Sequence, residues 1–165
     1  MGANIGMFML FVRQQRPDAR VYAFEPVPAI YETLQLNTGL YGKGQVKTFA
    51  FGLSDAEKED EFTYYPQFSA RSGLASYADA GEEVAVIKQF LRNRAARGES
   101  GMEELAEEAE RLLEGVFEGE RHRCSLRRLS EVIREEGIER IDLLKIDVQQ
   151  AELDVLLGID EGDWA

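Results

Sequence analysis

Hydrophobic positions at the start of the chain alternate between the spacing of helices and that of strands. Residues 5–15 begin with a run that is apolar on nearly every side, which is typical of a helix buried against a sheet. Residues 20–24 and 46–51 have the short pattern of strands, and residues 29–40 repeat apolar side chains at helical spacing. Because helix and strand alternate, we expect an α/β fold with a mostly parallel sheet and flanking helices.

The middle of the chain departs from this alternation. Residues 61–65 predict an added strand, and residues 66–81 are rich in Gly, Ser and Ala, as in a long loop. Two helices follow, at 82–97 and 102–117, each with an apolar stripe at 3–4 spacing. The two stripes suit packing against each other or over a pocket.

The regular pattern returns near the end of the chain. We expect a strand at 122–126, a helix at 129–136 that Gly137 stops, and a final helix at 151–157. Between these helices, residues 141–147 form a nearly continuous apolar run. Such a run is typical of a central strand that is buried on both faces.

Length and composition fit one domain. With 165 residues, of which 44% are hydrophobic, the chain is long enough to bury a core, so residues 1–165 are interpreted as a single domain. Within it, residues 66–120 are expected to be an inserted loop and helical pair, and a candidate cap over a pocket. The net charge of −12 disfavours nucleic acid as a partner.

Cysteine content and hydropathy indicate where in the cell the protein is expected. Cys124 is the only cysteine, so neither an internal disulfide nor a cysteine-based zinc site is expected. The longest unbroken apolar run, residues 7–12, is too short to span a bilayer, and no signal segment precedes it. We therefore expect a cytoplasmic protein without a membrane partner.

A glycine-bounded turn opens the chain and runs straight into the first helix. Gly2 and Gly6 have no Cβ, so the backbone between them can approach a ligand closely, and the positive end of the helix faces the same space. Glu25 ends the next strand, at the spacing where nucleotide-binding folds place an acid for the ribose hydroxyls. Turn and acid together predict half of an adenosine-cofactor pocket.

Asp147 and His122 are the candidate catalytic side chains. Asp147 ends the predicted strand 141–147 at the sheet edge that also holds Glu25, where open α/β sheets bind ligands; capping of the next helix is the alternative. His122, the only histidine, titrates in the range of a general base, although a lone strand histidine is more often structural. Asp147 and Glu152 are carboxylates whose spacing does not require a metal, and none is expected.

Four short motifs follow one another in a specific order and spacing. They are Gly2-Ala3-Asn4-Ile5-Gly6, Phe24-Glu25-Pro26, Gly52-Leu53-Ser54-Asp55 and Asp142-Leu143-Leu144-Lys145-Ile146-Asp147-Val148, the last followed by Ala151-Glu152. With them the chain resembles the FkbM family of S-adenosylmethionine-dependent methyltransferases, a class I Rossmann-like group. Ser72-Gly73-Leu74 and Tyr77-Ala78-Asp79 are similar to the subgroup linked to polyketide and nonribosomal peptide synthases.

The resemblance implies S-adenosylmethionine as the cofactor and a hydroxyl oxygen as the methyl acceptor, on a natural-product intermediate or a sugar, free or bound to a carrier protein. Glu25, with Pro26 beside it, would bind both ribose hydroxyls, and Asp147 would lie close to the sulfonium and the acceptor. The other cofactor-binding residues that it implies are Gly2, Ala3, Asn4 and Gly6 around the methionine and ribose, and Leu53 and Ser54 near the adenine.

The family pattern includes parts that this sequence does not show. An acid normally lies two places before the first glycine, at the end of a first strand, and further strands normally follow the last helix. Here Met1 is one place before Gly2, and the sequence ends at Asp163-Trp164-Ala165. We therefore interpret it as a methyltransferase domain truncated at both ends. Such a piece is expected not to be self-sufficient, with its missing strands supplied by a longer chain or a partner.

Two other functions fit parts of the pattern. A nicotinamide-dependent oxidoreductase would have a Gly-x-Gly-x-x-Gly turn, but Asn4 stands where the middle glycine belongs. A non-catalytic methyltransferase-like module that binds a partner through its acidic helices is favoured by the absent first-strand acid. The presence of Glu25 and Asp147 disfavours that module.

Overall fold

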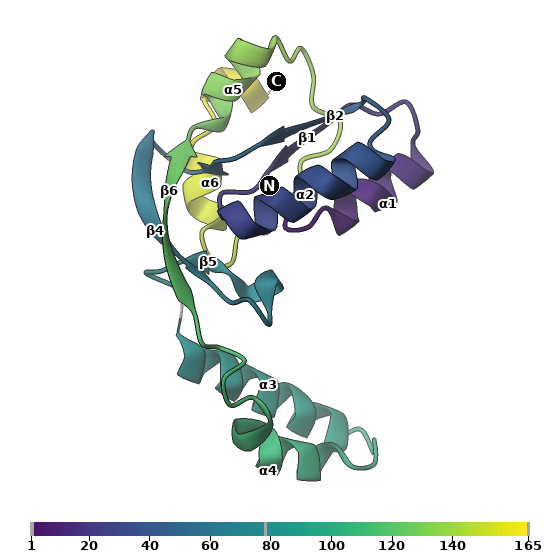
Figure 1. Cartoon of the computed structure of the whole chain (residues 1–165), viewed down its shortest axis with the longest axis vertical. Helices are drawn as coiled ribbons and strands as arrows, with labels where there is room; N and C mark the ends of the chain where they lie inside the picture. The colour runs from purple at the N-terminus through teal and green to yellow at the C-terminus, as the bar shows by residue number, and fades with distance from the viewer. Residues whose placement is uncertain (1, 78, 165) are drawn as a thin grey trace.

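Figure 1 shows the computed structural model of the chain, which describes residues 2–77 and 79–164. A mixed α/β body fills the upper part of the view, and a helical arm projects from it at the lower end. The body contains α1 (Met7–Gln15), β1 (Val21–Phe24), α2 (Pro28–Tyr41), β2 (Val46–Phe49), β3 (Gly52–Leu53), β4 (Lys58–Tyr64), η1 (Ser69–Arg71), β5 (Gly73–Leu74), β6 (Glu120–Arg127), α5 (Leu129–Glu136), α6 (Glu152–Leu157) and η2 (Glu161–Trp164). The arm consists of α3 (Ala80–Ala95) and α4 (Met102–Leu112).

The strands form two sheets. β1 and β2 pair in parallel, from Val21 opposite Val46 to Phe24 opposite Phe49. The second sheet has the order β3-β6-β4-β5; β3 is parallel to β6, but β4 is antiparallel to both of its neighbours. The expectation of a mostly parallel sheet is therefore wrong for this second sheet. Two parts of the chain explain the difference: β5 folds back on β4 before the arm, and after the arm β6 runs back along β4 (Figure 1).

Helices cover both faces of β1 because its side chains alternate. Ala23 packs with α1 and with the fully buried Leu34 of α2. Phe24 points to the opposite face and packs with α5 and with Val155 of α6. Successive side chains of a strand lie on opposite faces, so this short strand is buried from both sides. The two helical layers thus fix the end of β1, where Glu25 follows.

Most of the predicted helices and strands are confirmed, with ends that lie within two residues of the expected bounds. Two differ more. The helix expected at 102–117 ends at Leu112, before Gly115, whose φ of 76° does not fit a right-handed helix. The strand expected at 61–65 begins earlier and spans Lys58–Tyr64 as β4, because it pairs with β6 along its whole length.

The central strand expected at 141–147 is not a strand in the structure. No described strand pairs with this segment, and a strand needs a neighbour for its backbone hydrogen bonds. Its apolar side chains are also covered on one side only. Leu144 and Ile146 pack with the cluster around Phe24, whereas Leu143 is 66% exposed. The apolar run therefore packs on the body from one side.

The arm lies at the far end of β4 and β6, away from α1 and α2 (Figure 1). Its two helices pack on each other: Ala106 and Ala109 of α4 are buried, and Lys88 of α3 forms an ion pair with Glu110 at 2.6 Å. This is the first of the two arrangements that the apolar stripes allow. None of the described helices, the arm included, is long and apolar enough to cross a membrane.

Candidate functional site

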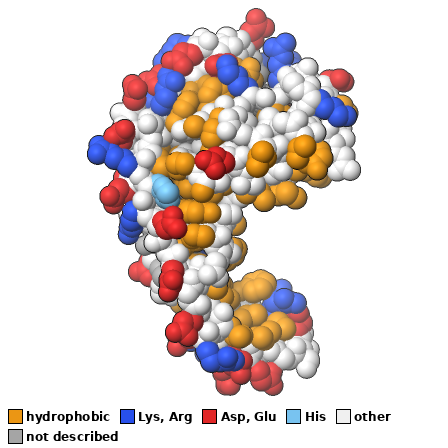
Figure 2. All heavy atoms as spheres, in the orientation of Figure 1, with side chains coloured by type: hydrophobic (Ala, Val, Ile, Leu, Met, Phe, Trp, Pro, Cys, Tyr) orange, Lys and Arg blue, Asp and Glu red, His pale blue; other side chains and the backbone are white. Residues whose placement is uncertain are grey.

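A cavity lies at the end of β1, between the two sheets. One wall comes from the glycine-bounded turn and the residues after β1, and the opposite wall from β3, β4 and β6. Residues 69–74, which we term the roof segment, supply a third side. Figure 2 shows hydrophobic side chains gathered in the middle of the body, with acidic ones among them and most of the charged ones along its outer edge. The cavity is lined by Gly2, Asn4, Phe24, Glu25, Pro26, Val27, Ile30, Gly52, Leu53, Phe62, Ser69, Ala70, Ser72, Gly73, Leu74, Leu126, Asp147, Val148, Gln149 and Ala151.

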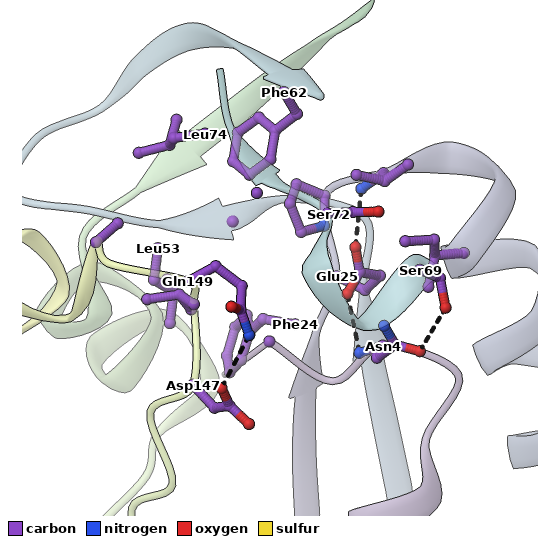
Figure 3. A pocket seen from close by; sticks show the side chains of 18 of the residues that line it. Asn4, Phe24, Glu25, Leu53, Phe62, Ser69, Ser72, Leu74, Asp147 and Gln149 are labelled. Carbon is purple, nitrogen blue, oxygen red and sulfur yellow. Dashed lines mark hydrogen bonds between the residues drawn. The ribbon is translucent and has the colours of Figure 1, made fainter. Parts of the chain in front are cut away.

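Glu25 is the buried acid of this cavity, with 5% of its surface exposed. Its Oε2 accepts a hydrogen bond from the Asn4 amide at 2.9 Å, and its Oε1 accepts one from the Val27 amide at 3.1 Å (Figure 3). Burial raises the pKa of Glu25 from its ordinary 4.5 to about 7, although both amide bonds act to lower it. Each carboxylate oxygen still has a lone pair, so Glu25 can accept from two further donors.

The glycine-bounded turn is held against the segment that leads into α6. Gly2 has a φ of 65°, and a Cβ on it would lie 1.8 Å from the backbone oxygen of Asp147. Only glycine allows this close approach. The Ala3 amide donates to the Phe24 carbonyl at 2.9 Å, which ties the same turn to the end of β1. Turn, strand end and Asp147 therefore form one continuous wall.

Asn4 connects this wall to the roof segment. Its φ of 48° lies in the left-handed region, which asparagine tolerates better than most residues. The side-chain Oδ1 accepts hydrogen bonds from the Ile5 amide at 2.7 Å and from the Ser69 hydroxyl at 3.3 Å. Figure 3 shows Ser69 and Asn4 pointing toward each other beside Glu25. The inserted part of the chain thus reaches the turn through Ser69.

Asp147 lies at the rim of the cavity, and in the view of Figure 3 Phe24 is between it and Glu25. Its Oδ2 accepts a hydrogen bond from Lys145 Nζ at 2.7 Å, and its Oδ1 accepts one from Gln149 Nε2 at 3.3 Å. The alternative role as a helix cap is wrong, because α6 begins after Ala151, and side chains engage both Asp147 oxygens. Glu25 and Asp147 line the same cavity, as the sequence predicted. The residues directly before Asp147, 141–146, do not form a strand.

The predicted cofactor-binding residues divide into two groups. Ala3 and Gly6 belong to the turn but do not line the cavity: Ala3 packs with the cluster of α1 and α2, and a Cβ on Gly6 would be 2.8 Å from the Leu34 side chain. Ser54 is buried behind β3 and donates a hydrogen bond to Asp55 at 3.0 Å. The residues that do line the cavity are Gly2, Asn4, Glu25, Pro26, Leu53 and Asp147.

His122, the second catalytic candidate, is not among the cavity-lining residues. It lies on β6, where its ring packs edge-on against Tyr64 at 5.8 Å between centroids. Its Nε2 is 3.5 Å from a carboxylate oxygen of Glu120. His122 thus lies outside the cavity, and its role as a general base stays a prediction.

The apolar side of the cavity was not identified from the sequence. Phe62 of β4 and Leu126 of β6 are buried there, and Leu74 of the roof segment faces them. Of these three residues, only Leu74 belongs to one of the sequence motifs, Ser72-Gly73-Leu74. The strand pattern of residues 61–65, with Phe62 and Tyr64 two places apart, was the available signal for Phe62. Gln149, which bonds Asp147, had no sequence signal at all.

The comparisons with known proteins agree with the motifs. The whole chain, residues 1–165, matches the Methyltransferase FkbM domain. The chain therefore belongs to the FkbM family of methyltransferases. Among the described residues, no group of three or more His, Cys, Asp or Glu is arranged to hold a metal ion.

Three relatives align with nearly the whole chain. The chain is 52% identical over its full length to the AMB antimetabolite synthetase AmbE of Pseudomonas aeruginosa, of which it covers 8%. It is 38% identical to the 31-O-demethyl-FK506 methyltransferase FkbM of Streptomyces tacrolimicus and 35% to the Methyltransferase sdnD of Sordaria araneosa. Those matches include 99% of this chain but 59% and 60% of the relatives, so the chain spans well under two thirds of their length. No solved structure matches it significantly.

Proposed function

We propose that this domain binds S-adenosylmethionine and takes part in methylation of a hydroxyl oxygen on a natural-product intermediate. The observation that carries the proposal is the buried Glu25 carboxylate beside the glycine-bounded turn, in a chain of the FkbM family. A class I Rossmann-like arrangement suits it, because the cavity lies at the carboxyl end of β1, where such folds bind nucleotides.

The residues present fit this cofactor. Two hydroxyls of a ribose can donate to the two Glu25 oxygens, which already accept one backbone amide each. Leu53 and Phe24 offer apolar surface for a flat base. Gly2 leaves the turn without a side chain where the ligand would approach it. When bound, S-adenosylmethionine supplies an electrophilic methyl group on a sulfonium.

For the acceptor side we propose Asp147 as the contact. A hydroxyl placed at the rim would donate to the Asp147 carboxylate, which would orient the hydroxyl oxygen toward the methyl group that the cofactor supplies. The hydroxyl proton passes to the carboxylate and from there to water. The main contributions of the protein are then orientation and a fixed negative charge.

The names of the relatives support the acceptor class. One is named for methylation of 31-O-demethyl-FK506, which is methylation at oxygen, and another is a synthetase of an antimetabolite. By analogy we propose an alcohol on a small molecule or on a carrier-bound intermediate as the substrate.

We further propose that the insertion at 66–120 contributes to the acceptor side, because its roof segment lines the cavity. That the arm acts as a cap stays a prediction.

The test uses the natural protein at its full length. Calorimetry should detect S-adenosylmethionine binding, and incubation with labelled cofactor and a panel of alcohols should give labelled ethers. Binding without transfer to any alcohol, thiol or amine would favour the non-catalytic module instead. Binding of a nicotinamide dinucleotide in place of S-adenosylmethionine would favour the oxidoreductase.

Cofactor binding should depend on pH near neutrality. The ionised Glu25 carboxylate accepts from both ribose hydroxyls, whereas its protonated form has lost acceptor capacity. Because its pKa is about 7, affinity should fall as the pH decreases from about 8 to about 5, by up to about tenfold per pH unit below the pKa. Titration calorimetry across this range measures the effect, and Glu25→Gln should abolish it. A wild-type profile that matches Glu25→Gln would exclude Glu25 as the titrating group.

Stability of the free protein should show the opposite trend. The raised pKa means that the folded state holds the Glu25 proton more tightly than the unfolded chain does. The stabilisation is fully present below about pH 4.5 and is lost as the pH rises through about 7. As the pH rises from about 4.5 to above 7, the wild type should therefore lose thermal stability relative to Glu25→Gln.

A further inference from the structure

Two consecutive residues next to Asp147 hold a backbone conformation that side chains rarely adopt. Gln149 has a φ of 54° and Gln150 a φ of 75°. Such strain persists only where the surrounding structure imposes it, and it concentrates at functional sites. Gln149 lines the cavity, so the strain at Gln149 lies at the rim of the candidate site.

The side chain of Gln149 bridges two parts of that rim. Its Nε2 donates to Asp147 Oδ1 at 3.3 Å, and its Oε1 accepts a hydrogen bond from Arg71 of η1 at 3.5 Å. A Cβ on Gly73 would lie 3.0 Å from the Gln149 Cβ, so the roof segment also contacts Gln149 closely. Figure 3 shows Gln149 directed toward Asp147. Lys145 donates to the other Asp147 oxygen at 2.7 Å, so the carboxylate is held from two sides.

Gln150 shares the backbone conformation but not these contacts. It is exposed, and it is not among the residues that line the cavity. The two glutamines can therefore be compared directly. Both have a positive φ, but the side chain of Gln149 lines the cavity and that of Gln150 faces solvent.

We infer that Gln149 is a positioning residue that orients the Asp147 carboxylate toward the acceptor hydroxyl and couples it to the roof segment. The inference rests on the proposed function. A carboxylate with one donor on each oxygen has a fixed direction for its remaining lone pairs, and a bound alcohol would meet them in one orientation. Release of one donor lets the carboxylate rotate. The acceptor would then be less well aligned, while the Glu25 side of the pocket is unaffected.

The test compares four variants in the full natural protein: Gln149→Gly, Gln149→Glu, Gln150→Gly and Gln150→Glu. Glycine relieves the positive φ at either position, so both glycine variants should fold. Gln149→Gly should lower kcat about tenfold or more, with the Kd for S-adenosylmethionine within about twofold of wild type. Gln149→Glu should shift the acidic limb of the pH–rate profile to higher pH, because a second carboxylate beside Asp147 disfavours its ionised form. Both Gln150 variants should behave as wild type.

The outcomes separate this inference from the function on which it rests. A wild-type protein that transfers methyl to no alcohol overturns the proposed function, and the inference with it. An active wild type in which the Gln149 variants match the Gln150 variants in kcat and pH profile overturns the inference alone. Gln149→Asn keeps the amide in a residue that tolerates positive φ, and it should retain more activity than Gln149→Gly.

Discussion

Replacement of Glu25 by alanine should weaken S-adenosylmethionine binding by about 1–3 kcal/mol, which is about 5- to 150-fold in Kd. The variant loses two charge-assisted acceptors for the ribose hydroxyls. It also leaves the Asn4 and Val27 amides without the carboxylate that fixes the turn. Titration calorimetry on the full natural protein at about pH 8, where the carboxylate is mostly ionised, measures the loss.

Two controls make the Glu25 result specific. Glu32→Ala removes an exposed carboxylate of α2 and should leave affinity unchanged. Glu25→Gln keeps the size of the side chain, but its amide can accept only one of the two backbone donors, so it should fall between wild type and Glu25→Ala. Equal cofactor affinity for wild type and Glu25→Ala would refute the assignment of the ribose site.

Gly2→Ala should reduce cofactor affinity by about tenfold or more while the domain stays folded. The new methyl group would lie 1.8 Å from the Asp147 backbone oxygen, so the turn must separate from the segment before α6. Glu25 accepts a hydrogen bond from the Asn4 amide of this same turn, so displacement of the turn disturbs the wall that carries both Glu25 and Asp147. Calorimetry and far-UV circular dichroism together distinguish loss of the site from loss of the fold.

Gly44→Ala is the matched control for this variant. Gly44 has a φ of 75°, close to the 65° of Gly2, but a Cβ on it meets nothing within 4 Å. Backbone strain alone should cost both variants a similar amount of stability, about 1 kcal/mol. If the two variants lost affinity equally, the close approach of Gly2 to Asp147 would have no functional role.

Local signals in the sequence identified the glycine-bounded turn, which lines the cavity in the structure. Gly2 and Glu25 could be predicted because a glycine turn before a helix and an acid after the next strand are marked by residue type and spacing. Both lie on the same wall of the cavity in the structure. The helical arm could be predicted for a similar reason, since each helix has its own apolar stripe.

Pairing between distant segments could not be read in the same way. Ser69 and Leu74 reach the cavity because β5 pairs with β4 and η1 bonds the turn, and nothing in the local pattern of residues 66–81 specifies those partners. The segment 141–147 has the composition of a buried strand, yet strand formation depends on a neighbour that supplies hydrogen bonds. The strain at Gln149 is likewise a product of packing around it.

The position of the cavity between two separate sheets also bears on how the domain unfolds. Phe24 and Glu25 extend from the first sheet, whereas Leu53, Phe62 and Leu126 belong to the second. A ligand that contacts residues of both sheets connects them, although no strands of the two sheets pair with each other among the described residues. Such a ligand adds RT ln(1 + [L]/Kd) to the stability of the joined state, about 2.7 kcal/mol at a hundredfold excess over Kd. The bound cofactor would thus hold the two sheets together. Its cellular concentration would then influence how cooperatively the two sheets unfold.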